Sequence, residues 1–279
     1  MTAHATDPRP VRRVSAVTAS GALSKDDFDP VVVEAPLSIS VGGEILATTM
    51  RTPGHDEDLA VGWLASETDL SARTDVTTIK REGAAASRWQ GIAEAVDTVH
   101  LQVAASVEIP KARAYLTSSS CGICSVEVIE ATPRPRVALQ SIGWQLTPQE
   151  AHEWVAAMRE EQKMFALTGS LHAAAIIAPG GSLRVVREDV GRHNAVDKVI
   201  GGAFLSGDYP LTDHVLVVSG RVSYEIVAKA LRACTAGIVA VSGPTTLAVD
   251  LARAHGLVLV GFTREDRLNV YAGGDCVAQ

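Results

Sequence analysis

The sequence predicts an α/β fold, α+β overall, in which a smaller, mostly antiparallel β domain precedes a layered α/β domain. Strand-like runs and a hairpin signal dominate residues 30–140. Over residues 145–279, apolar strands alternate with amphipathic helices, a pattern typical of helices packed on a buried, partly parallel sheet. The chain has 279 residues, of which 47% are hydrophobic, enough apolar material for a sizeable core.

The first half is expected to begin with a flexible N-terminal arm, because residues 1–29 carry prolines and show no hydrophobic periodicity. The β-rich runs at 31–41 and 44–51 are separated by Gly42-Gly43 and predict a hairpin. Residues 56–66 combine an acidic first turn with helical spacing of Leu59 and Trp63, which predicts a helix. Further strands are expected at 76–80, 98–103 and 112–117.

The second half is expected to begin with a helix from residue 148 to about residue 165. Thr147 suits the N-cap, Pro148 the first helical position, and Glu150 completes a capping box. The strand-like runs that follow lie at 171–178, 183–187, 214–219, 238–241, 257–263 and 268–271. The helical patterns between them lie at 193–205, 224–233 and 245–255.

Composition excludes several classes of function. The formal charge of −7 argues against nucleic-acid binding, which requires Lys and Arg to neutralise phosphates. Only 4% of residues are aromatic, so base-stacking platforms are not expected either. Apolar runs stay well short of the ~18 residues that a membrane helix needs. The segment after Arg12-Arg13 is too short and too polar for an export signal, so we expect a cytoplasmic protein without membrane partners.

Two of the four cysteines lie close together, as Cys121-Gly-Ile-Cys124. Ser120 is a suitable N-cap, and a cysteine in the first turn of a helix has its thiolate stabilised by free N–H groups and the helix dipole. A nucleophile or sulfur carrier is therefore the leading hypothesis. The alternatives are two small buried side chains, a redox disulfide or half of a zinc site. A zinc site would need further clustered ligands, and Cys234 and Cys276 stand alone.

His172 is the second candidate, within Gly169-Ser-Leu-His172. Zinc nucleoside deaminases combine H-x-E with a later C-x-x-C. Here Ala174 occupies the position of the glutamate, and the cysteine pair precedes the histidine. The sequence therefore predicts no deaminase reaction and no permanent metal. The alternative for His172 is a hydrogen-bonded histidine in the core.

A third cluster is the polar string from Arg187 to Asn194, followed by Asp197 and Lys198. On a helix, His193 shares a face with Asp197, and Asn194 with Lys198. So many polar groups at a helix start within an apolar domain indicate a site. The alternative is a solvated helix start with ordinary ion pairs.

Two strand ends suggest an anion site. Ser219-Gly220 and Ser242-Gly243 each follow an apolar strand and precede a helix, and helix N-termini at strand ends attract anions. The alternative is a pair of ordinary tight turns. Arg264 and Arg267 follow the next strand, where their guanidinium groups suit bidentate phosphate contacts.

These motifs together resemble the FdhD family, the formate dehydrogenase accessory sulfurtransferases, over nearly the whole chain from about residue 30. The motifs that carry the resemblance are Cys-Gly-x-Cys after a serine run, Thr168-Gly-Ser-Leu-His172, Glu188-Asp-Val-Gly-Arg-His-Asn194 with Asp197-Lys198, Ser219-Gly-Arg221 and Gly261-Phe-Thr-Arg264. The resemblance implies a cytidine-deaminase-like three-layer α/β domain in the second half and a homodimer.

The resemblance also implies a sulfurtransferase that takes persulfide sulfur from a cysteine desulfurase. Its bound substrate would be Mo-bis(molybdopterin guanine dinucleotide), which receives the sulfur before insertion into formate dehydrogenase. Cys121 matches the persulfide carrier, with Cys124 beside it. The family's cofactor-binding stretch matches Phe262, Thr263, Arg264, Glu265, Asp266 and Arg267.

Further candidate contacts to the cofactor, or to a guanine nucleotide as its fragment, are Ser219, Gly220, Ser242, Gly243, His172 and His193. Two alternative functions remain at this point. One is a chaperone that binds the cofactor without moving sulfur. The other is a thiol-disulfide oxidoreductase, for which the usual thioredoxin-like βαβ context is missing around Cys121.

Overall fold

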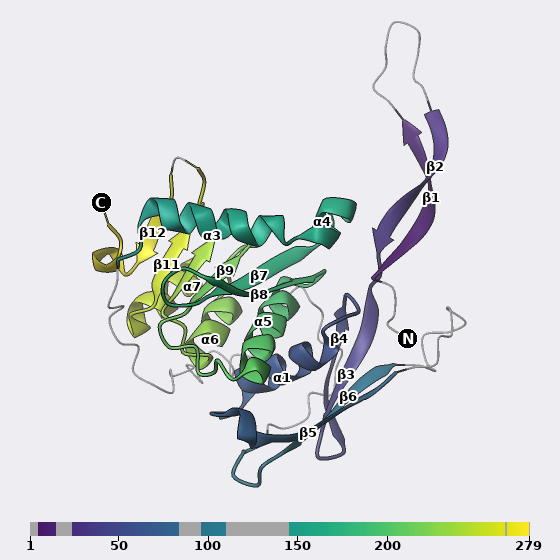
Figure 1. The fold of residues 1–279 in the computed structure, drawn as a ribbon, viewed down its shortest axis with the longest axis horizontal. Helices are drawn as coiled ribbons and strands as arrows, with labels where there is room; N and C mark the ends of the chain where they lie inside the picture. The colour runs from purple at the N-terminus through teal and green to yellow at the C-terminus, as the bar shows by residue number, and fades with distance from the viewer. Residues whose placement is uncertain (1–4, 15–23, 84–95, 110–144, 266, 279) are drawn as a thin grey trace, which may run out of the picture.

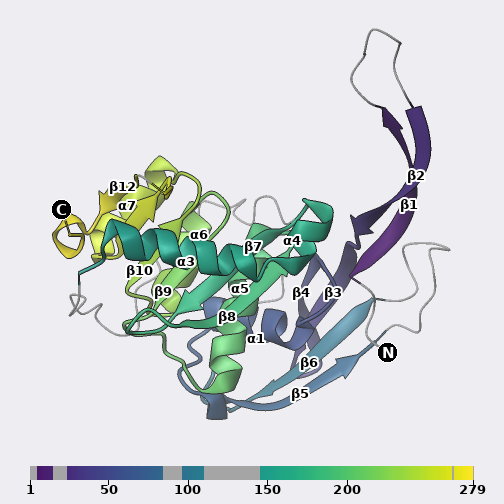
Figure 2. The same cartoon turned by 45° about the horizontal axis from the view of Figure 1, so that its top comes forward.

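The computed structural model describes residues 5–14, 24–83, 96–109, 145–265 and 267–278. It is a mixed α/β structure with a two-stranded ribbon, a four-stranded sheet and a six-stranded sheet that carries helices on both faces (Figures 1 and 2). Cys121, Cys124, Asp266 and the strand expected at 112–117 lie outside the described residues. No helix in the described ranges combines the length and apolarity needed to cross a membrane.

The N-terminal ribbon consists of β1 (Thr6–Val14) and β2 (Ser24–Val32), which pair antiparallel and project away from the rest of the molecule (Figures 1 and 2). These strands fall largely within the stretch expected to form a flexible N-terminal arm, in which no regular element was predicted. Hydrophobic alternation detects strands with one buried face, whereas this ribbon leaves even Phe28 65% exposed. Pro8 and Pro10 are tolerated because β1 lies at an edge.

The four-stranded sheet has the order β4-β3-β6-β5. Its strands are β3 (Ala35–Val41), β4 (Glu44–Arg51), β5 (Val76–Glu82) and β6 (Asp97–Val103). Gly42 and Gly43 form the predicted hairpin turn with φ angles of 61° and 95°, a region that favours glycine. The pairs β3–β4 and β5–β6 are antiparallel and β3–β6 is parallel, so the mostly antiparallel sheet is confirmed for the described strands.

The six-stranded sheet has the order β12-β11-β10-β9-β7-β8, and β9, β10 and β11 run parallel. Its strands are β7 (His172–Ile177), β8 (Leu183–Asp189), β9 (Val215–Val218), β10 (Gly237–Ala240), β11 (Val258–Gly261) and β12 (Asn269–Ala272). The α-helices of this half are α3 (Pro148–Glu160), α4 (Lys163–Thr168), α5 (Arg192–Ser206), α6 (Tyr224–Arg232) and α7 (Thr246–His255). The predicted alternation of strands and helices is confirmed.

Alternating side chains of the central strands separate two layers of core. On β7, Ala173 and Ala175 face α3, where they pack with Trp154. Ala174 and Ile176 face the opposite layer, formed by α5, α6 and α7. This is the consequence of the two-residue period of a strand, and it explains why the buried strands are apolar on both sides. Short 3-10 turns at Arg73–Asp75 and Gly274–Cys276 complete the described elements.

The two halves of the chain meet where α1 (Asp56–Glu67) crosses α5. Gly62 and Gly201 face each other's helices at this crossing, and a Cβ on either would overlap a backbone carbonyl of the other helix. The two glycines therefore let the helix axes approach closely. The hydrophobic core continues through the crossing, from Leu37 and Leu101 of the four-stranded sheet to α5.

The helix expected from 148 to about 165 is broken in two. Thr147 and Glu150 form the predicted capping box, but α3 ends at Glu160. Gln162 has a non-helical ψ of 63°, and α4 begins after it. The Glu188 carboxylate accepts hydrogen bonds from the backbone N–H groups of residues 164 and 165, at 2.9 and 2.7 Å. A side chain that is distant in the sequence, Glu188, thus stabilises the start of α4.

Candidate functional site

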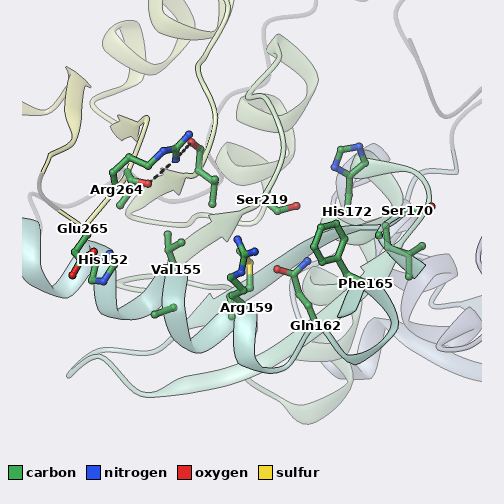
Figure 3. Close-up of a pocket in the computed structure, with 16 residues that line it drawn as sticks. His152, Val155, Arg159, Gln162, Phe165, Ser170, His172, Ser219, Arg264 and Glu265 are labelled. Carbon is green, nitrogen blue, oxygen red and sulfur yellow. Dashed lines mark hydrogen bonds between the residues drawn. The ribbon is translucent and has the colours of Figure 1, made fainter. Parts of the chain in front are cut away.

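A cavity of about 760 Å³ lies between α3–α4 and the carboxyl ends of the parallel strands (Figure 3). Ser219 follows β9, Val241 follows β10, and Thr263 and Arg264 follow β11. The start of β7 places His172 at the same edge. Of the predicted contacts, the structure brings His172, Ser219, Thr263, Arg264 and Glu265 to this cavity, at the sheet edge where open α/β sheets bind ligands.

Other predicted contacts lie behind the cavity wall and shape it. A Cβ on Gly220 would lie 3.3 Å from Nδ1 of His172, so glycine lets the turn pack against the imidazole. Gly243 lies beneath the ring of Phe262, which has a positive φ of 51° and is 43% exposed. The backbone oxygen of Ser242 accepts from the N–H of Phe262 at 3.2 Å, so the loops that follow β10 and β11 are hydrogen-bonded to each other.

Hydrogen bonds fix the polar side chains at the strand ends. The Ser219 hydroxyl accepts from the Ala173 N–H at 2.9 Å, which extends the contact between β7 and β9. Nη1 of Arg264 donates to the backbone oxygens of Val241 and Thr263 at 2.7 and 2.9 Å. The backbone N–H of Arg264 donates to the oxygen of Arg267, closing the turn. The guanidinium of Arg264 is therefore held at the cavity rim.

His172 lies in positive surroundings. Burial lowers the pKa of this half-buried imidazole, and Arg192 and Arg221 lower it further, while Asp189 acts in the opposite direction. The imidazole is therefore neutral near pH 7. Two arginines beside a neutral histidine leave this end of the cavity suited to an anion.

The string around Asp189 forms a buried network. Asp189 is fully buried, forms an ion pair with Lys198 at 2.7 Å, and accepts hydrogen bonds from Asn194 and the backbone N–H groups of Thr52 and Gly191. Lys198 also donates to the Thr52 carbonyl at 2.9 Å. The alternative of a solvated helix start is wrong. The network ties the start of α5 to the end of β4.

A second buried set lies deeper along α5. Asp197 pairs with Lys229 of α6 at 2.8 Å and accepts from the Ser66 hydroxyl of α1 at 3.1 Å. Burial raises the pKa of Asp197 to about 6, an effect that Lys229 partly offsets. Nε2 of His193 lies 3.1 Å from the Ser223 hydroxyl and 3.5 Å from Glu225. His193 thus joins α5 to α6 and does not line the cavity.

The FdhD/NarQ family model matches residues 32–278. The chain belongs to the FdhD/NarQ family. The resemblance drawn from the motifs is thereby confirmed. The motif residues at 188–198, which carried much of that resemblance, mainly hold the two halves of this FdhD/NarQ chain together.

Relatives of known name cover almost the whole chain. The sulfur carrier protein FdhD of Streptomyces coelicolor is 43% identical over 256 residues, covering 90% of this chain and 89% of that protein. The protein of the same name from Mycobacterium tuberculosis is 40% identical over 271 residues, covering 95% and 96%. A crystal structure from Desulfotalea psychrophila, described as a formate dehydrogenase accessory protein, covers 97% of this chain and 99% of its own with a TM-score of 0.70 at 22% identity, and so shares the fold.

Sequence reasoning missed the cavity residues on α3 and α4. Arg159, Gln162 and Phe165 line the cavity, and they were assigned to one continuous helix with no site attached. Their spacing of three residues is the only signal in the sequence, and any exposed helix face provides such spacing. Across the described ranges, no group of three or more His, Cys, Asp or Glu side chains is placed to hold a metal ion.

We expect an anion bound beside His172 to raise the pKa of its imidazole, because negative charge stabilises the imidazolium. Binding then takes up a proton, so affinity should increase as pH falls through the window between the lowered pKa of the free protein and the raised pKa of the complex. NMR titration of the ring resonances with and without pyrophosphate measures both pKa values. His255, which does not line the cavity, is the internal control.

The Arg221→Gln variant tests the cause of the lowered pKa. Arg221 is exposed, so the substitution should leave the fold intact while raising the pKa of His172 in the free protein. An unchanged pKa of His172 in a pyrophosphate complex would place the anion elsewhere.

Proposed function

We propose that this protein carries persulfide sulfur from a cysteine desulfurase to the bis-guanine-dinucleotide molybdenum cofactor before that cofactor enters formate dehydrogenase. The observation that carries the proposal is 43% identity, over 90% of the chain, to a protein named sulfur carrier protein FdhD. The motif Cys121-Gly-Ile-Cys124 supplies the thiols. The proposal includes a cytoplasmic location, because persulfides and thiolates persist in a reducing compartment.

The proposed sulfur uptake is a thiol exchange at Cys121. Its thiolate attacks the outer sulfur of the desulfurase persulfide, a new sulfur–sulfur bond forms on Cys121, and the desulfurase cysteine leaves as a thiolate. No net oxidation occurs in this step. A helix N-terminus following Ser120 would favour the thiolate of Cys121, and Cys124 is the second thiol of the proposed site.

The cavity at the ends of β9, β10 and β11 is the proposed site for the cofactor, which is the substrate here. Its volume of about 760 Å³ lies in the range of small-ligand pockets and suits one nucleotide arm. The residues present fit such a group, since His172 lies among cations and the Thr263 hydroxyl is buried without a partner among the described residues. Two guanine arms would need two such cavities, which is consistent with the proposed homodimer.

The assignment of the second half as cytidine-deaminase-like is also part of the proposal. It is supported by the parallel strands β9, β10 and β11 with α6 and α7 between them, and by α5 and α6 starting side by side through His193 and Ser223. Ala174 lies in a strand of the sheet and offers no proton-transfer group.

We expect Cys121→Ala to abolish sulfur loading. After incubation with a cysteine desulfurase and cysteine, intact-mass analysis should show one added sulfur atom on the wild-type protein and none on the variant. The variant should also fail to support formate dehydrogenase activity in cells. Cys276→Ser, at a cysteine outside the motif, is the control and should load normally.

Full formate dehydrogenase activity with Cys121→Ala would favour the chaperone that binds cofactor without moving sulfur. A mass loss of two hydrogens with no added sulfur would favour a thiol-disulfide oxidoreductase that cycles Cys121 and Cys124.

A further inference from the structure

Gln162 is a buried polar residue that faces the cavity. It lies in the break between α3 and α4 and is only 5% exposed. Its amide points into the cavity between Arg159 and Phe165 (Figure 3). Within the described ranges, no hydrogen bond reaches the side-chain amide of Gln162, whereas the nearby Glu188 carboxylate is paired with two backbone N–H groups. Unlike the inaccessible Thr263 hydroxyl, this amide is accessible from the cavity, so its donor and acceptor are free to pair with a ligand.

The chemistry of an amide limits what that ligand is. The carboxamide presents a donor and an acceptor side by side. A phosphate offers only acceptors and leaves the amide oxygen unpaired. A lactam edge, with a ring N–H beside a carbonyl, pairs with both groups at once. The amide therefore fits the edge of a heterocyclic base better than it fits the phosphates.

The neighbours of Gln162 are suited to the faces of the same base. Phe165 supplies an aromatic ring and Arg159 a planar guanidinium, and both kinds of group stack on heterocycles. The Glu188 carboxylate holds the backbone of Phe165 at 2.7 Å and thereby maintains the break that presents Gln162. If α3 continued through residue 165, residues 162 and 165 would instead lie on one face of a single helix, as residues three apart ordinarily do.

We propose that Gln162 positions the base of the bound substrate by two parallel hydrogen bonds to a lactam edge. Guanine has this edge, and the pterin ring of the molybdenum cofactor has the same one. The inference rests on the proposed function and adds which residue recognises the ring. His172 and Arg264 are then left for the phosphates.

The test is a calorimetric titration of the full chain with GDP, neopterin and pyrophosphate. Gln162→Met keeps the length of the side chain and removes the amide. The ligand whose lactam edge pairs with the Gln162 amide should bind this variant about tenfold to a hundredfold more weakly, which is the loss expected for two hydrogen bonds. Pyrophosphate, which has no base, should bind both proteins equally. Gln149→Met, at an exposed glutamine of α3, should leave the affinity for all three ligands unchanged.

Weakening of GDP binding alone identifies guanine as the ring, and weakening of neopterin binding alone identifies the pterin. Unchanged affinity for both, or an equal loss for pyrophosphate, overturns the role of Gln162 while leaving sulfur loading on Cys121 standing. If the wild-type protein binds none of the three ligands, both this inference and the cofactor cavity are wrong. Gln162→Glu provides a second variant should Gln162→Met fold poorly, and its carboxylate should repel the carbonyl of the lactam.

Discussion

Gly201→Ala is expected to lower the free energy of unfolding by at least about 3 kcal/mol, at or beyond the upper end of the usual cost of overpacking. The added methyl group would overlap the backbone oxygen of Asp58, and Gly62→Ala would overlap that of Asp197. Backbone cannot rotate away as a side chain does, so α1 and α5 have to separate. Separation opens the core that both halves share. Urea unfolding followed by circular dichroism measures the loss.

Gly202→Ala is the matched control, one residue along the same helix. The nearest atoms to its added methyl would be side-chain ends of Asp58, Val185 and Arg187, at 3.3–3.4 Å. These side chains need to shift only slightly, and alanine is a better helix former than glycine by about 1 kcal/mol, which offsets the cost of the shift. The stability should therefore change little. A Gly201→Ala protein as stable as Gly202→Ala would contradict the close helix crossing.

Asp189→Asn is expected to remove about 3–5 kcal/mol of stability, because it leaves the charge of Lys198 buried without its partner. Both side chains are almost fully inaccessible, and their 2.7 Å ion pair is joined to Thr52 on the other half of the chain. Lys198→Met should cost a similar amount. The double variant should be more stable than either single variant, since no uncompensated charge remains. Denaturant unfolding of the four proteins gives the coupling energy.

The exposed pair of Arg184 and Asp208 provides the comparison. Arg184→Met should cost at most about 1 kcal/mol, because solvent screens the charges. If Asp189→Asn cost no more than Arg184→Met, the buried network would not hold the two halves together.

Most elements of the fold could be predicted because their signals are local. Alternation, turn glycines and the Thr147–Glu150 capping box each act within a few residues. The break after Glu160 could not be predicted, because the carboxylate that starts α4 belongs to Glu188, on another strand. The β1–β2 ribbon escaped prediction for a different reason: none of its described side chains is buried, so its sequence shows no hydrophobic alternation.

The site was predicted in part. His172, Ser219 and Arg264 were found because strand ends of parallel sheets are general ligand positions. The structural role of the residues around Asp189 was not predicted. Asp189 bonds to Thr52, which is 137 residues away, and no local pattern reveals that contact. Gln162 looked like one polar residue of an exposed helix face. Only its burial and its place at the cavity distinguish it.

Strand β8 has a mechanical consequence for the molecule. Neighbouring side chains of a strand point to opposite faces. Glu188 therefore accepts hydrogen bonds from the backbone of α4 at the cavity, while Asp189 accepts one from the backbone of Thr52, which follows β4. The two attachments are one residue apart on the same strand. The placement of α4 at the cavity and the placement of the end of β4 are therefore both set by the same strand, β8.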